Sequence, residues 1–162
     1  MTVIGIDPGY ARVGYGIVRY EKNRFHVLEY GILNTKAGTP FAQRLEEIYL
    51  GLQTLFAKHK PDGFAIEKLF FNTNAKTAID VAQARGVLML AAQLEGLQAA
   101  EYTPLQIKQS VCGYGRADKQ QMQEMTRILL NLPSIPKPDD AADALACAIC
   151  HCHTSGSLIG RM

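Results

Sequence analysis

The sequence predicts a single α/β domain built on a mixed sheet, and three observations lead to this prediction. Short apolar runs separated by turn residues come first in the chain, which is typical of an antiparallel meander. From Pro40 onward the apolar spacing changes to three and four residues, which is typical of amphipathic helices. Short apolar runs then alternate with helical segments, a pattern that favours parallel strands beside the meander.

Size and composition agree with this fold class. With 162 residues, 48% of them hydrophobic, the chain can bury a core without disulfide or metal staples, so we expect one domain over residues 1–162. The formal net charge of +2 is too small to indicate a nucleic-acid partner by itself. Because no apolar segment is long enough for a signal peptide or a membrane span, we expect a cytoplasmic protein with no membrane partner.

The first half of the chain is expected to hold three antiparallel strands, one helix and a short buried strand. Turn residues at Pro8-Gly9 and the polar segment 21–24 separate the first three apolar runs. Helical spacing then continues for about four turns, until Pro61-Asp62-Gly63 breaks it. The predicted bounds are strands at residues 2–6, 14–20 and 25–33, a helix from 41 to 60 and a strand at 64–66.

The second half is expected to be mainly helical. Small and apolar residues at helical spacing predict a long helix that contains Gly86. Thr103-Pro104 is a typical helix start, and Asp118 with Gln121 resembles a capping box. The predicted bounds are a helix at 75–97, a strand at 97–102, a helix from 103 that carries Lys108, a basic loop at 113–116, and helices at 119–130 and 140–152.

Carboxylates occur where the predicted elements can bring them together. Asp7 closes the first strand, and Glu67 closes the short strand after the first helix. Asp140 and Asp143 lie in the first turn of the last helix, where a spacing of three places them on one face. Asp139 is nearly as well placed, and spacing alone does not separate it from Asp140. Taken singly, each residue is also explained as a turn former, a strand end or a helix cap.

Taken together, these carboxylates point to metal chemistry. If the two strands are neighbours, Asp7 and Glu67 lie side by side, and such a cluster of like charges is repulsive unless cations occupy it. Oxygen ligands without His or Cys favour Mg²⁺ or Mn²⁺. A pair of such ions about 4 Å apart can drive in-line phosphoryl displacement. The sequence therefore predicts a two-metal site for phosphoryl transfer.

The C-terminal string Cys147-Ala-Ile-Cys150-His151-Cys152-His153 offers a competing metal hypothesis. Cys-x-x-Cys-His matches a c-type haem attachment site, and Cys with His suggests zinc. However, the string lies in an Ala-, Leu- and Ile-rich helical pattern, and no second ligand pair follows at zinc-finger spacing. Buried structural thiols are therefore the favoured interpretation.

Five motifs, in order along the chain, resemble the RuvC family of Holliday-junction resolvases. The resemblance covers nearly the whole chain. It implies a ribonuclease-H-like fold and a Mg²⁺-dependent endodeoxyribonuclease that acts as a homodimer. It also implies symmetric nicking of four-way DNA junctions, in recombination and repair, with 5′-phosphate and 3′-hydroxyl products. The motifs are Gly5-Ile6-Asp7-Pro8-Gly9, Ala65-Ile66-Glu67-x-x-Phe70-Phe71, Gln83-Ala84-Arg85-Gly86, Gly113-x-Gly115-x-Ala117-Asp118-Lys119 and Asp140-Ala141-Ala142-Asp143-Ala144-Leu145-Ala146.

The resemblance also implies roles for single residues. It implies two Mg²⁺ ions per subunit, replaceable by Mn²⁺, and a branch-migration motor as a partner. It favours Asp140 over Asp139, so that the implied metal ligands are Asp7, Glu67, Asp140 and Asp143. Basic catalytic residues are implied at Lys108 and Lys119, and a ring that stacks near the junction crossover at Phe70. The full set of implied DNA-binding residues is Phe70, Arg85, Lys108, Arg116 and Lys119.

Three other functions remain as alternatives from the residues alone. An actin-like sugar or acetate kinase also begins with Gly-Ile-Asp-x-Gly, but it needs a second lobe that 162 residues cannot supply. A DNA-binding module without catalysis would lose affinity for phosphate by keeping its carboxylates. A nuclease for another branched or hybrid nucleic acid is the hardest to exclude. The helix at 75–97 is the candidate dimer interface, although packing on its own sheet explains its small residues equally well.

Overall fold

The structure, a computed structural model, describes residues 1–69 and 75–159. Its strands are β1 (Thr2–Asp7), β2 (Arg12–Glu21), β3 (Arg24–Asn34), β4 (Gly63–Glu67) and β5 (Ala99–Tyr102). They form one five-stranded sheet in the order β3-β2-β1-β4-β5. β1, β2 and β3 pair antiparallel, whereas β4 pairs parallel with β1 and β5 parallel with β4. The predicted mixed sheet is therefore confirmed.

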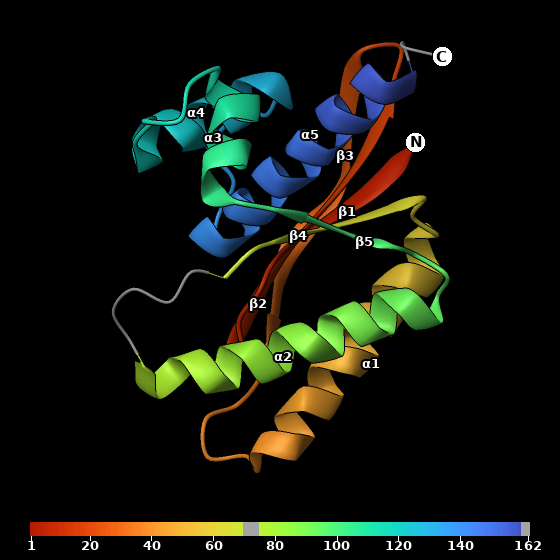
Figure 1. Cartoon of the computed structure of the whole chain (residues 1–162), viewed down its shortest axis with the longest axis vertical. Helices are drawn as coiled ribbons and strands as arrows, with labels where there is room; N and C mark the ends of the chain where they lie inside the picture. Colours follow the sequence, from red (N-terminus) through yellow and green to blue (C-terminus); the bar gives the residue numbers. More distant parts are fainter. Residues whose placement is uncertain (70–74, 160–162) are drawn as a thin grey trace.

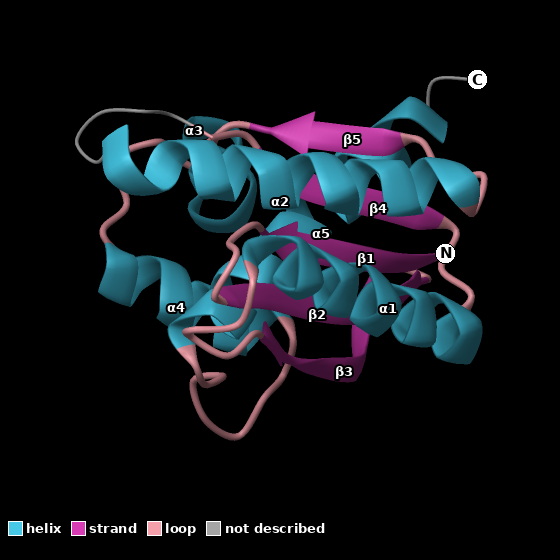
Figure 2. Cartoon of the chain, turned by 90° about the horizontal axis from the view of Figure 1, so that it is seen from below, coloured by secondary structure: helices cyan, strands magenta, loops and turns pink. Residues whose placement is uncertain are grey.

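Helices cover both faces of this sheet (Figures 1 and 2). The first two helices in the chain, α1 (Phe41–His59) and α2 (Ala75–Leu94), pack together on one face, over a core that includes Ile4, Ile6 and Phe64. The other three pack on the opposite face, over a core that includes Val3, Val18 and the buried side of the last helix. None of the described helices is long and apolar enough to cross a membrane. The three helices on the opposite face are α3 (Pro104–Cys112), α4 (Lys119–Leu129) and α5 (Asp139–Ile159).

Two helix ends differ from the prediction. α2 ends at Leu94 instead of residue 97, because Gly96 adopts a positive φ of 76° that turns the chain into β5. α5 continues to Ile159 instead of ending at Cys152. At the predicted end, Cys152 is fully buried and the ring of His153 packs edge-on against Phe25, so the helix is still in contact with the core there.

Glycines allow α5 to lie unusually close to the sheet. A Cβ atom on Gly5 of β1 would come within 2.1 Å of the Ala144 carbonyl oxygen. A Cβ atom on Gly14 of β2 would come within 2.0 Å of the Asp140 carbonyl oxygen. Backbone therefore packs directly on backbone at these two points. This contact brings the first turn of α5 to the end of β1.

Capping boxes fix the starts of the two short helices. The Thr103 hydroxyl accepts from the Gln106 backbone N–H at 3.1 Å, and the Gln106 side chain accepts from the Thr103 N–H at 2.8 Å. Asp118 and Gln121 make the same reciprocal pair at the start of α4, at 2.8 and 2.9 Å, which confirms the predicted capping box. α3 and α4 consequently begin at defined positions.

Candidate active site

The parallel register of β1 and β4 places the first two carboxylates at one edge of the sheet. Ile6 pairs with Ile66, and both side chains are fully buried. Asp7 and Glu67 are the next residues of the two strands, so their side chains leave the core at the same end. The condition that the two strands are neighbours in the sheet is therefore met.

α5 adds the other two carboxylates, and the group is electrostatically coupled. Burial, followed by repulsion from Glu67, Asp143 and Asp140, raises the pKa of Asp7 to about 8. Burial and repulsion from Asp143 raise the pKa of Glu67 to about 7, although Lys108 acts in the opposite direction. Burial likewise raises the pKa of Asp143, against the effect of Lys119. The structure thus brings together the four predicted carboxylates, and burial with mutual repulsion outweighs the nearby lysines at Asp7, Glu67 and Asp143.

Asp139 has a different environment, although it adjoins the cluster in sequence. Its carboxylate pairs with Lys119 at 2.7 Å and accepts from the Gln123 side-chain amide at 3.0 Å. The bond from Lys119 lowers the pKa of Asp139. Asp140, in turn, pairs with Arg12 at 3.1 Å. Both acids are therefore paired with a cation, and Asp140 as a metal ligand stays a prediction, supported by its repulsion of Asp7.

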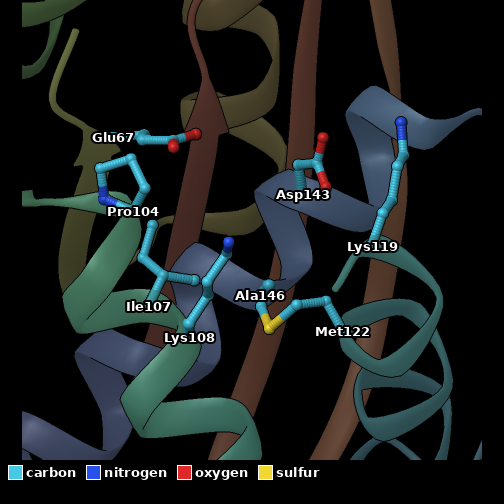
Figure 3. Close-up of a pocket in the computed structure, with 8 residues that line it drawn as sticks. All are labelled: Glu67, Pro104, Ile107, Lys108, Lys119, Met122, Asp143 and Ala146. Carbon is cyan, nitrogen blue, oxygen red and sulfur yellow. The ribbon is translucent and has the colours of Figure 1, made fainter. Parts of the chain in front are cut away.

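A cavity of about 220 Å³ opens beside Glu67 and Asp143 (Figure 3). The Lys108 ammonium points into the space between these two carboxylates, and Lys119 stands on the far side of Asp143. Pro104 lies next to Glu67, and Ile107, Ala146 and Met122 complete the apolar lining of the cavity. The two predicted lysines thus border the same cavity as two of the carboxylates, from the helices α3 and α4.

The donor set fits a hard divalent cation, because it consists of carboxylate oxygens whose mutual repulsion a cation would relieve. Within residues 1–69 and 75–159, no three His, Cys, Asp or Glu side chains are already arranged to hold one ion. The repulsion between the carboxylates is compatible with the lack of a preformed three-ligand group, since Coulomb coupling acts over longer distances than metal coordination. Coordination therefore requires side-chain rotation, and Asp140 would have to exchange its pairing with Arg12 for the ion. No local pattern in the sequence pointed to Arg12.

The other predicted DNA-binding residues differ in their surroundings. The Arg85 side chain is only 14% exposed, pairs with Glu101 and donates to the Glu67 carbonyl oxygen at 3.2 Å. This guanidinium therefore holds the end of β4, and its contact with DNA stays a prediction. Arg116 is exposed in the loop between α3 and α4. Phe70 lies outside the described residues.

The C-terminal cysteines behave as buried structural thiols. Cys147, Cys150 and Cys152 are free and buried, and burial raises the pKa of each thiol. The two neighbouring histidines have other partners. His151 Nδ1 lies 2.8 Å from the Tyr102 hydroxyl, and His153 Nδ1 lies 3.1 Å from the Ser110 hydroxyl. These contacts give the zinc and haem hypotheses no support.

Comparison with known proteins gives a consistent result. Residues 3–151 match the family described as Crossover junction endodeoxyribonuclease RuvC. A protein of that name from Alkaliphilus metalliredigens is 56% identical over 154 residues, which cover 95% of this chain and 94% of that protein. Another from Ruminiclostridium cellulolyticum is 55% identical over 163 residues, with 99% and 98% covered.

Solved structures agree with the sequence relatives. The structure of Thermus thermophilus RuvC superposes with a TM-score of 0.91 at 31% identity, over 97% of this chain and 96% of that one. T. thermophilus RuvC in complex with Holliday junction substrate gives a TM-score of 0.89 at 29% identity, with the same coverage. The ribonuclease-H-like fold class implied by the motifs is thereby confirmed. This chain belongs to the RuvC family of crossover junction endodeoxyribonucleases.

Proposed function

We propose that this chain is a Mg²⁺-dependent endodeoxyribonuclease that resolves four-way DNA junctions by paired, symmetric nicks. The observation that carries the proposal is the convergence of Asp7, Glu67 and Asp143 beside Lys108, in a chain of this family. A structural relative has been solved with a Holliday junction substrate, which supports the substrate class. Cytoplasmic action in recombination and repair, with a branch-migration motor as partner, is part of this proposal and is supported by family membership.

Metal ions supply the central chemistry of this proposal. Two Mg²⁺ ions, replaceable by Mn²⁺, would activate water and stabilise the leaving 3′ oxygen, giving 5′-phosphate and 3′-hydroxyl ends. The residues that would hold them are Asp7, Glu67, Asp140 and Asp143. Asp7, Glu67 and Asp143 are half-buried, and a cation beside them would offset the burial and repulsion that raise the pKa of each carboxyl.

The lysines of the cavity would act on the phosphate. The Lys108 ammonium lies where it can neutralise a phosphate oxygen placed between Glu67 and Asp143. Lys119 is the first residue of α4, so that the helix N-terminus and the ammonium attract the same anion. The apolar lining near Pro104 excludes water from one side of the bound phosphate, which strengthens these interactions.

Two cuts related by symmetry require two sites, and we propose that α2 forms the interface of a homodimer. One face of α2 buries Ala84, Leu88 and Ala91 against the core. The opposite face leaves Ile79 and Leu90 exposed by 68% and 56%. A helix that is apolar on both faces suits a two-fold contact in which the same surface meets itself.

Charge inserted on that face tests the dimer. Leu90→Glu would keep the native circular dichroism spectrum but sediment as a monomer, and it would abolish paired nicking. Ile128→Glu is the matched control, because Ile128 is 50% exposed on α4, on the opposite face of the sheet. A Leu90→Glu protein that remains a dimer would show that another surface forms the interface.

The function itself is tested with three substrates. A mobile four-way junction, a linear duplex and an RNA–DNA hybrid are incubated with the protein in Mg²⁺ or in EDTA. Paired nicks at symmetric positions, confined to the junction and dependent on Mg²⁺, are expected. Equal cutting of the hybrid would instead identify a nuclease for another nucleic acid.

A further inference from the structure

A second cavity, of about 610 Å³, lies beside the candidate active site. Three elements contribute cations to it: Arg12 begins β2, Lys119 begins α4, and Lys137 lies in the segment that leads into α5. Asp139 and Asp140 form its acidic side. Lys119 also lines the first cavity, so the two cavities share a wall.

The cations of this second cavity are available to a new partner. The side chains of Arg12, Lys119 and Lys137 are 51%, 63% and 70% exposed. Their ion pairs with Asp139 and Asp140 are surface pairs, and such pairs contribute about 0–1 kcal/mol each. Exchanging a carboxylate for a phosphate oxygen therefore requires little free energy.

Charge balance favours a polyanion once the adjoining site is filled. The cavity holds three cations against two carboxylates. The proposed function assigns a divalent ion to Asp140, and this inference rests on that assignment. With Asp140 engaged there, Arg12 loses its partner and three cations face Asp139 alone. A phosphate is then the group that satisfies a planar guanidinium next to two ammonium groups.

We propose that Arg12 and Lys137, together with Lys119, form a phosphate-binding subsite that holds the DNA backbone next to the scissile phosphate. The subsite continues the path of the strand across the shared wall formed by Lys119. It fixes the register of the strand and carries no base specificity, as contacts to phosphate generally do.

The test neutralises protein and DNA charges in turn. Junction binding is measured in Ca²⁺ over a series of salt concentrations for the native chain and for Arg12→Gln/Lys137→Gln. The slope of log K against log salt is expected to fall by about 2, roughly one for each phosphate that the variant no longer neutralises. The matched control is Arg19→Gln/Arg24→Gln, which removes two exposed charges from the other end of the β2–β3 hairpin. Equal slopes for the two double variants would overturn the proposal.

Neutral methylphosphonates in the DNA locate the contact. When they replace the phosphates that flank the cut, the native chain is expected to lose about tenfold in affinity, whereas Arg12→Gln/Lys137→Gln loses little more. If the affinity losses from the substitutions and from the methylphosphonates are additive, the subsite is rejected, even if the native chain nicks junctions normally. If the native chain nicks no junction but this coupling persists on duplex DNA, the proposed function fails and the subsite stands.

Discussion

Two groups of carboxylates in this chain experience opposite environments. At the ends of β1 and β4, burial and like charges raise the pKa of Asp7 to about 8. On the face covered by α1, Glu29 accepts a 2.7 Å hydrogen bond from Lys58 and lies 2.6 Å from His59 Nε2. The bonds from Lys58 and His59 lower the pKa of Glu29 to about 2. Glu29 stabilises the fold, whereas Asp7 is kept in a place where its charge opposes folding, as expected of a functional group.

The substitution Asp7→Asn tests this comparison with the largest expected effect. Cleavage should fall on the order of 1,000-fold, because the central metal-binding carboxylate is lost. Junction binding should remain. In EDTA, the variant should be more stable than the native chain above pH 4, and the difference should grow up to about pH 8, since the unfolded Asp7 ionises near 3.8 and the folded one near 8. Thermal melts and single-turnover cleavage are the measurements.

The matched variant is Glu29→Gln, which should give the reverse pattern. Stability should fall by about 1 kcal/mol, because Glu29 loses its charge-assisted bonds, and cleavage should be unchanged. A loss of stability in Asp7→Asn equal to that in Glu29→Gln would mean that both acids serve the fold, and would remove the distinction between them.

The substitution Gly14→Ala should disrupt the carboxylate cluster without removing any carboxylate. Its Cβ would lie 2.0 Å from the Asp140 carbonyl oxygen, so α5 must move away from the sheet. We expect a loss of about 1–3 kcal/mol in stability from overpacking and about 100-fold in cleavage from misplacement of the acids. Gly156→Ala on the same helix is the control, because its nearest neighbour, a Tyr20 ring carbon, is 3.7 Å away. This control should melt at or above the native temperature.

Mg²⁺ should stabilise the fold, and this stabilisation should depend on the carboxylate cluster and not on Glu29. At a Mg²⁺ concentration ten times the dissociation constant, mass action stabilises the fold by about 1.4 kcal/mol, or roughly 4 °C in Tm. Asp143→Asn should lose most of this shift, whereas Glu29→Gln should keep it. Calorimetric melts in Mg²⁺ and EDTA measure both. An undiminished shift in Asp143→Asn would place the bound ion elsewhere.

The smallest expected effect is the pH dependence of the contribution that Glu29 makes to the free energy of unfolding. Its folded pKa of about 2 lies below the unfolded value of 4.5, so its contribution is complete above pH 4.5 and is lost as the pH falls towards 2. The native chain and Glu29→Gln should therefore differ by about 1 kcal/mol at pH 6 and converge near pH 2. Urea unfolding at several pH values is the measurement, and a constant difference at all pH values would assign the effect to shape and not to charge.

Local signals in the sequence account for much of the fold and of the site. Asp7 and Glu67 end apolar runs that are too short for helices, and the capping pair Asp118 and Gln121 is encoded within four residues. These features depend on near neighbours in the chain, so that pattern and propensity suffice to predict them. The pairing of β1 with β4 then follows from the alternation of strands and helices.

The features that sequence reasoning missed depend on contacts between distant elements. Gly14 appears in the sequence as one strand residue among others, and only the packed helix shows that a side chain there would meet the Asp140 carbonyl. Arg12 and Arg85 are likewise engaged by acids that are far away in the sequence or on other elements.

The sheet separates two cores, one beneath α1 and α2 and the other beneath α5. The proposed chemistry lies with α5 and the strand ends, and the proposed self-association surface lies on α2. Substitutions that accumulate on the outer side of α2 can therefore alter how copies recognise one another while the hydrolytic machinery keeps its shape. Such a layout lets assembly and catalysis diverge independently among descendants of one ancestor, and it gives an engineer two surfaces that can be rebuilt one at a time.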